Sequence, residues 1–156
     1  MVNSKQPLTN ARLMAVQAVY AQAQSGESWD KVISRFLLGE VGGELIEEKS
    51  GIERYVSLPE ADQSLFAHLT QYVRDNKEQL NDMVEGAFSE KIQRDKVDLT
   101  LRSILLVGVA EFFVNNQLDA PIIINEYTDI ARSFYEGPQI KIVNAVLDKM
   151  AKILKG

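Results

Sequence analysis

The residue types that most often carry catalysis or bind metal are scarce in this sequence. It has no cysteine and a single histidine, His68, so thiolate nucleophiles, disulfides, cysteine-based zinc sites and paired-histidine metal sites are excluded within one chain. The acidic neighbours Glu47-Glu48 and Asp95/Asp98 fit a solvated surface better than a general acid–base pair. Neither a glycine-rich phosphate loop nor a nucleophile elbow occurs. The sequence therefore predicts a binding protein without catalytic residues, metal or cofactor, and not an enzyme.

Basic residues are concentrated at the two ends of the chain, although the net charge of the 156 residues is −5. Residues 1–26 carry Lys5 and Arg12 and no acidic side chain, and residues 137–156 carry four lysines against one aspartate. If the two ends meet in the fold, they form a positive patch on an acidic body, which is the minimum footprint of a nucleic-acid-binding protein. The alternative is that lysines near a helix C-terminus only interact with the helix dipole. The charge pattern leaves both interpretations open.

The sequence shows neither a targeting segment nor a membrane span. Residues 1–10 carry one lysine and no apolar run, which is unlike a secretory signal. The longest apolar stretch covers residues 104–114, whereas a membrane-spanning helix needs about 20 residues. We therefore expect a cytoplasmic protein with no membrane contact.

Apolar residues at helical spacing, separated by helix stop signals, predict helices in the N-terminal half of the chain. Thr9 or Asn10 is expected to cap the first helix, and a capping box at residues 57–60 is expected to open the third. The third helix is expected to pause near Asp75 and to resume as far as Phe88. The predicted helices of this half span residues 9–25, 28–38 and about 60–88, and residues 39–57 form a loop.

The C-terminal half is predicted to hold the core helix of the molecule. The helix expected over residues 98–115 is apolar nearly all round, which is typical of a helix in the middle of a bundle. The next begins at residues 119–121 with proline in its first turn, and its inward stripe is expected to extend to Phe134. Residues 137–138 open the last helix. The sequence thus predicts an all-α fold of about seven helices, with a weak centre near residues 39–57 or 90–97 as the place where it would divide into two helical halves.

Four blocks of the sequence resemble the NusB transcription antitermination family, in the same order and at similar spacing. Residues 11–20, ARLMAVQAVY, match the opening-helix pattern A-R-x-x-A-V-Q-A-L-Y, and residues 101–111, LRSILLVGVAE, are similar to L-R-A-I-L-R-x-G-A-x-E. Residues 119–134 resemble D-x-P…I-N-E-Y-x-D-I-A-x-x-F, and residues 143–148, VNAVLD, resemble V-N-G-V-L-D. The blocks extend over almost the whole chain and look most like the alphaproteobacterial branch of the family.

This resemblance implies both a fold and a function. The fold is a single domain of two small helical subdomains packed at an angle, approximately residues 1–90 and 91–156. The family binds boxA, a short single-stranded RNA element, and pairs with NusE, which is also a small-subunit ribosomal protein. Together they modify transcribing RNA polymerase so that it passes terminators, notably during ribosomal RNA synthesis. The resemblance therefore implies an antitermination factor whose partners are boxA RNA, NusE and the RNA polymerase antitermination complex, with no cofactor.

The same resemblance implies RNA-binding residues near both ends of the chain. Arg12 matches the retained arginine of the first helix and is expected to contact a phosphate or a base edge, the alternative being a surface salt bridge. Gln17 faces RNA or hydrogen-bonds a neighbouring helix. Lys5 and Lys141 lie in the basic stretches, and Tyr135 offers a ring on which a base can stack. We expect a surface that joins residues 4–20 to residues 135–142.

Two further residues are expected to contact the partner protein. Tyr20 matches the family tyrosine near the partner surface, with a place in the core as the alternative, and Arg102 belongs to the second matching block. Asn125 and Glu126 are expected to orient the start of their helix through backbone hydrogen bonds. Asn144 is expected to be a buried structural residue that joins two helices.

The chain departs from the family pattern at positions that bear on RNA affinity. Leu106 stands where the pattern has a second arginine, and Ile142 and Ala145 replace the phenylalanine and glycine of F-V-N-G. Fewer arginines mean fewer counterions released on binding RNA. We therefore predict weak RNA binding by the chain alone, rescued by the partner protein. The alternative is a helical protein-binding module with weakened or lost RNA binding, and homodimerisation stays open.

Overall fold

The structure, a computed structural model, describes residues 6–39, 61–92 and 94–155. In these ranges the chain forms six α-helices, one short 3-10 helix and no strand, which confirms the all-α prediction. The chain divides into two compact units, an N-terminal unit of residues 1–70 and a C-terminal unit of residues 71–156. The division falls inside a helix, and not near residue 90, the boundary expected from the sequence.

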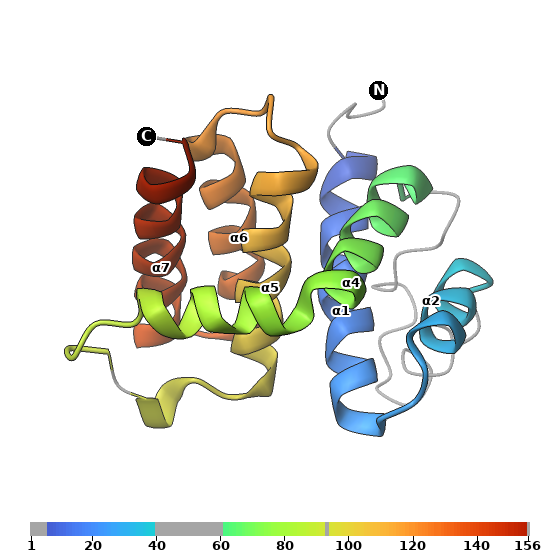
Figure 1. Cartoon of the computed structure of the whole chain (residues 1–156), viewed down its shortest axis with the longest axis horizontal. Helices are drawn as coiled ribbons and strands as arrows, with labels where there is room; N and C mark the ends of the chain where they lie inside the picture. The colour runs from blue at the N-terminus through green and yellow to red at the C-terminus, as the bar shows by residue number, and fades with distance from the viewer. Residues whose placement is uncertain (1–5, 40–60, 93, 156) are drawn as a thin grey trace. The chain divides into compact units, whose positions relative to one another are not determined.

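The N-terminal unit contains α1 (Gln6–Ser25), α2 (Trp29–Leu37) and the beginning of α4 (Gln63–Ala87) (Figure 1). The cap expected at Thr9 or Asn10 is wrong, because α1 begins upstream at Gln6 and both residues lie inside it. The side-chain oxygen of Asn10 instead accepts a hydrogen bond of 2.7 Å from Gln6 Nε2, one turn earlier. The presence of capping residues could not locate this helix start, because too few residues precede Thr9 for apolar spacing to indicate a helix there.

A tight turn joins α1 to α2. Gly26 ends α1 with a φ of 74°, in the left-handed region that glycine enters without steric cost. Its N–H donates to the carbonyl of Gln22 at 2.9 Å. Ser28 then caps α2 by accepting a hydrogen bond from the Lys31 N–H. These two stop-and-start signals are the ones that the sequence predicts.

Asp62 stabilises the start of α4 through two hydrogen bonds. Its Oδ1 accepts a hydrogen bond of 2.8 Å from the Leu65 N–H, and its own N–H donates to the carbonyl of Pro7 at 2.9 Å. The capping box expected at residues 57–60 lies outside the described residues. Further along, Asn76 leaves helical geometry with φ −130° and ψ 23°, so α4 is kinked next to the pause predicted near Asp75.

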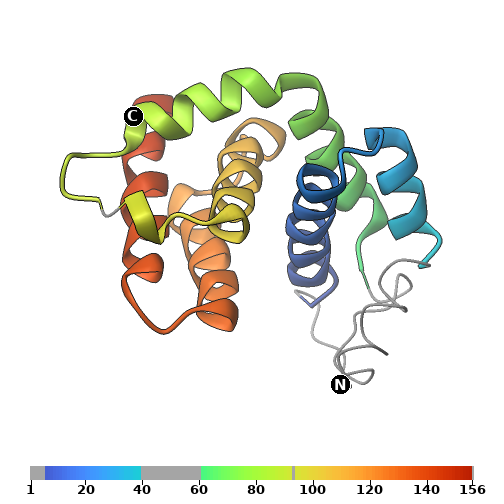
Figure 2. The ribbon, with the colours of Figure 1, turned by 90° about the horizontal axis from the view of Figure 1, so that it is seen from below.

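The C-terminal unit is built around α5 (Leu99–Val114), which is buried over most of its surface, as its apolar composition predicts. α6 (Ala120–Phe134) and α7 (Pro138–Lys155) contact α5 and each other (Figures 1 and 2). Gly108 permits a close approach, because a Cβ at this position would lie 3.1 Å from both Leu147 methyl carbons. Pro121 lies in the first turn of α6, as predicted.

The second half of α4 belongs to the same unit. The ring of Tyr72 stacks on that of Phe113 in α5, with centroids 5.3 Å apart. A short 3-10 helix, η3 (Arg94–Lys96), precedes α5. None of the described helices has the length and apolar character required to cross a membrane.

Candidate nucleic-acid interface

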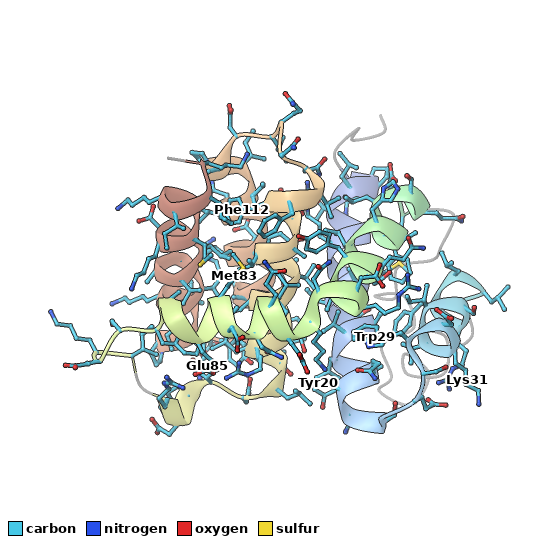
Figure 3. All side chains as sticks on the ribbon, viewed as in Figure 1. Tyr20, Trp29, Lys31, Met83, Glu85 and Phe112 are labelled. Atoms are coloured by element: carbon cyan, nitrogen blue, oxygen red, sulfur yellow. The ribbon has the colours of Figure 1, made fainter. Side chains whose placement is uncertain are left out.

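In the N-terminal unit, the structure places three of the predicted contact residues on α1. Arg12 is only 4% exposed, so it is not the surface residue that either sequence interpretation requires. A buried guanidinium keeps its charge and needs partners. Arg12 does interact with another group of the protein. Gln17 and Tyr20 are both partly exposed (Tyr20 is labelled in Figure 3). Lys5 lies outside the described residues.

In the C-terminal unit, Tyr135 is held at the turn between α6 and α7. Its hydroxyl donates to Asp98 Oδ1 at 2.5 Å, and the same Asp98 oxygen caps α5 by accepting from the Leu101 N–H at 2.9 Å. Burial, and then the hydrogen bond and negative charge of Asp98, raise the pKa of Tyr135. The phenol therefore stays protonated and anchored, while the ring remains partly exposed.

Phe134 corrects one prediction and adds a candidate. The sequence places Phe134 on the inward stripe of its helix, but the residue is 46% exposed and is the last residue of α6. Its ring centroid lies 6.4 Å from that of Tyr135, with the planes inclined by 52°. Two aromatic rings, and not one, therefore lie at this turn. Their adjacency in the sequence was the available signal.

Lys141 and Asn144 lie beyond the turn, in the first two turns of α7. Both are exposed. The prediction that Asn144 is buried and joins two helices is wrong, because α7 turns Val143 and Val146 inward and leaves Asn144 on the outer face. The polar side chain therefore remains in contact with solvent, as its type favours.

Arg102, the predicted partner contact on α5, already has a partner within its own unit. Its guanidinium pairs with Glu85 Oε2 at 2.5 Å, and Arg94 pairs with the other oxygen at 2.6 Å (Glu85 is labelled in Figure 3). Arg94 lies 4.8 Å and Arg102 6.0 Å from the ring centre of Phe88. Hydrogen bonding from Arg102, with a smaller contribution from Arg94, lowers the pKa of Glu85 against the opposing effect of burial. This cluster links the end of α4 to α5.

Comparison with known proteins decides the family. The NusB family model matches residues 9–152. The chain belongs to the NusB family. Several relatives called transcription antitermination protein NusB match it over nearly their full length. The protein from Caulobacter vibrioides is 32% identical over 150 residues, covering 96% of this chain and 95% of its own.

Two further NusB relatives are similarly close. The protein from Sinorhizobium fredii is 31% identical over 159 residues, covering 98% of this chain and 94% of its own. The protein from Brucella anthropi is 33% identical over 146 residues, covering 94% of this chain and 82% of its own. The predicted likeness to alphaproteobacterial members is thereby confirmed.

Two of the NusB-like sequence blocks meet in the core of the C-terminal unit. Glu111 is fully buried, and its Oε1 accepts a hydrogen bond of 2.6 Å from the hydroxyl of Tyr127. Its Oε2 accepts another, of 2.8 Å, from Asn115 Nδ2. A buried carboxylate is costly unless its oxygens are satisfied in this way. These NusB-pattern residues therefore join α5 to α6 and have a structural role.

Metal ligation finds no support among the described residues. In the ranges that the structure covers, no three His, Cys, Asp or Glu side chains are grouped so that they could hold a metal ion. His68 is exposed on α4, as expected for a surface histidine. The groups that could act on a partner are instead flat rings, amides and flexible cations, which are the side chains that bind single-stranded RNA.

Proposed function

We propose that this chain is a cytoplasmic transcription antitermination factor that binds boxA-type single-stranded RNA together with the NusE ribosomal protein. In this role it acts within the RNA polymerase antitermination complex and supports ribosomal RNA transcription by binding, without catalysis. The observation that carries the proposal is the NusB-family match over residues 9–152. The relatives named above, similar over nearly the whole chain, are called transcription antitermination proteins.

The α6–α7 turn supplies the chemistry for one part of RNA binding. Tyr135 presents a ring whose hydroxyl is tied to Asp98, so its orientation is set before RNA arrives. An ordered ring loses little conformational entropy on stacking with a base. Lys141, exposed in the first turn of α7, provides a cation for a phosphate of the same strand.

The other predicted contacts extend the proposal to the rest of the chain. Lys5, Arg12 and Gln17 would contribute further RNA contacts, and Tyr20 and Arg102 would contribute to the NusE surface. Contact between RNA and Arg12 requires its guanidinium to become accessible, since the residue is buried in this structure. Of the proposed RNA-contacting cations that the structure describes, Lys141 is exposed and Arg12 is buried, which supports weak RNA binding in the absence of the partner.

A fluorescence titration tests the function. Labelled boxA RNA is titrated with the full chain, with and without NusE, and a scrambled RNA of equal length is the control. We expect weak binding by the chain alone and at least tenfold tighter binding to boxA RNA with NusE present, because the partner adds contacts to the same strand. Failure to bind boxA RNA in both samples would reject the antitermination proposal.

The burial of Arg12 favours one alternative function, a helical protein-binding module that has lost RNA contact. In the same titration this module would bind NusE with no preference for boxA over the scrambled RNA. A homodimer that covers the RNA surface would instead show an RNA affinity that falls as protein concentration rises. Light scattering over a concentration series separates these two cases.

A further inference from the structure

The outer face of α7 is the feature that the proposed function leaves unused. Its inner face packs against the rest of the unit through buried apolar residues. At about 100° per residue, Lys141, Lys149 and Lys152 fall within about 80° of arc on the opposite side and span roughly 16 Å along the axis. All three are exposed.

Helix stability accounts for only part of this row of lysines. Lys152 lies in the last turn of α7, where the helix dipole favours a cation. Lys155 has a structural role, because its Nζ donates to the carbonyls of Asn116 and Leu118 at 2.9 and 2.8 Å. Lys141 lies in the first turn, where the dipole disfavours a cation, and Lys149 precedes the last turn, so these two lysines need another explanation.

The surroundings of these lysines leave them open to a long ligand. Asn144 and Ala145, which lie between Lys141 and Lys149 on the same face, are short and exposed. Lys152 is 77% exposed and pairs with Asp148 at 3.1 Å. Both side chains are exposed, and an ion pair of this kind contributes little to stability. A polyanion can displace such a pair at small cost.

We propose that Lys141, Lys149 and Lys152 form a phosphate track, along which RNA flanking the bound element continues over α7. The proposal rests on the proposed function, because the track begins at Lys141, one of the cations proposed to contact RNA. Charge complementarity selects the occupant: the chain as a whole carries −5, yet this face is basic, and lysine binds phosphate as a point charge without reading sequence. The track lengthens the RNA contact and adds no sequence preference.

A comparison of RNA lengths tests the track. The full chain with NusE is titrated with boxA RNA and with the same RNA extended by unstructured nucleotides on either side. The test variant is Lys149→Gln/Lys152→Gln, which leaves Lys141 and Tyr135 in place. We expect the wild type to bind the extended RNA more tightly at low salt, and the variant to lose that gain. Each phosphate contact adds about 0.7 to the slope of log affinity against log salt for single strands, so the variant's slope for extended RNA should fall by about 1.4.

A matched variant controls for net charge. Lys31→Gln/Lys91→Gln removes two exposed lysines outside α7 and should keep the gain and the salt slope of the wild type. Circular dichroism melting confirms that both variants fold. Equal slopes for the α7 and control variants would overturn the track while leaving boxA binding intact. Absence of boxA binding by the wild type would reject the proposed function itself. In a further sample, a polyglutamate segment is attached to boxA RNA in place of the extra nucleotides. A gain in affinity equal to that of the extended RNA would assign the face to an acidic protein and overturn the RNA track.

Discussion

At the scale of single residues, arginines that look available for a partner are already occupied. Arg94 and Arg102 share Glu85 and both lie over the ring of Phe88. The cluster connects α4 to the segment before α5 and places planar cations where the chain changes direction. To contact a partner protein, Arg102 must either keep its ion pair with Glu85 or exchange Glu85 for a group of the partner. The free-energy cost of that exchange depends on how strongly Glu85 holds Arg102.

The lowered pKa of Glu85 makes a prediction about pH. A carboxyl whose folded-state pKa is depressed stabilises the protein above its unfolded-state pKa, and this stabilisation is lost as the pH falls through the folded value. Because the side chain is 39% exposed, solvent screens the pairs, and Glu85→Gln should cost only about 0.5–1 kcal/mol near neutral pH. Urea unfolding at about pH 7 and about pH 3 measures this cost.

The difference between wild type and Glu85→Gln should shrink at the acid pH, because protonation of the carboxyl removes the charge that holds the two arginines. Arg94→Gln serves as the comparison, because it removes the more exposed of the two pairs and should cost less. A difference that is the same at both pH values would show that the ionised carboxylate does not stabilise the cluster.

Tyr135 gives a second prediction at this scale. Tyr135→Ala should weaken boxA binding by about 1–3 kcal/mol, the usual value of one base stacked on an aromatic side chain. Tyr135→Phe keeps the ring and loses only the hydrogen bond to Asp98, so its loss should be smaller, about 1 kcal/mol or less. The same fluorescence titration measures both variants. Equal losses for the two would assign the role to the hydroxyl and contradict stacking.

At the scale of elements, the packing of α5 against α6 and α7 depends on the absence of a side chain at Gly108. A Cβ there would lie 3.1 Å from the Leu147 methyls and 3.3 Å from the Tyr127 ring, closer than ordinary contact. Tyr127 cannot retreat freely, because its hydroxyl is bonded to the buried Glu111. The three helices are therefore held at one spacing by a small residue and a hydrogen bond.

Substitution of Gly108 tests this arrangement. Gly108→Ala should destabilise the protein by about 1–3 kcal/mol, the usual cost of overpacking a core, even though alanine has the higher helix propensity. Gly86→Ala in α4 is the matched control, since a Cβ there meets no atom within 4 Å, and it should be neutral or stabilising by up to about 1 kcal/mol. Urea unfolding measures both. Stabilisation by Gly108→Ala would show that the helices can separate without cost.

At the scale of the whole molecule, the distribution of charge matters more than its total. A chain with −5 net charge repels RNA at long range, so the proposed RNA contacts must come from local groups of cations such as those on α7. Arg12, one of the proposed cations, is buried. Dependence on a partner protein is therefore an expected consequence of the composition. The titration of boxA RNA with and without NusE tests it, with an expected gain in affinity of at least tenfold.

Much of the fold could be predicted because helical spacing is a local property. The end of α1 at Gly26, the cap of α2 at Ser28, the proline start of α6 and the kink beside Asp75 all follow from residues within one or two turns. The burial of α5 follows from its composition. The start of α1 was the exception, because several residues there are able to cap a helix and the sequence does not specify which of them does.

The sequence by itself determined that the molecule is helical, that it has no cysteine and a single histidine, and that its termini are basic. Only the tertiary structure decided which polar and aromatic residues are accessible. Arg12 is buried, Phe134 and Asn144 are exposed, and Arg102 is paired with a glutamate from another helix. Exposure and pairing depend on neighbours that are distant in the sequence, and a helical periodicity specifies which residues share a face without specifying what that face meets.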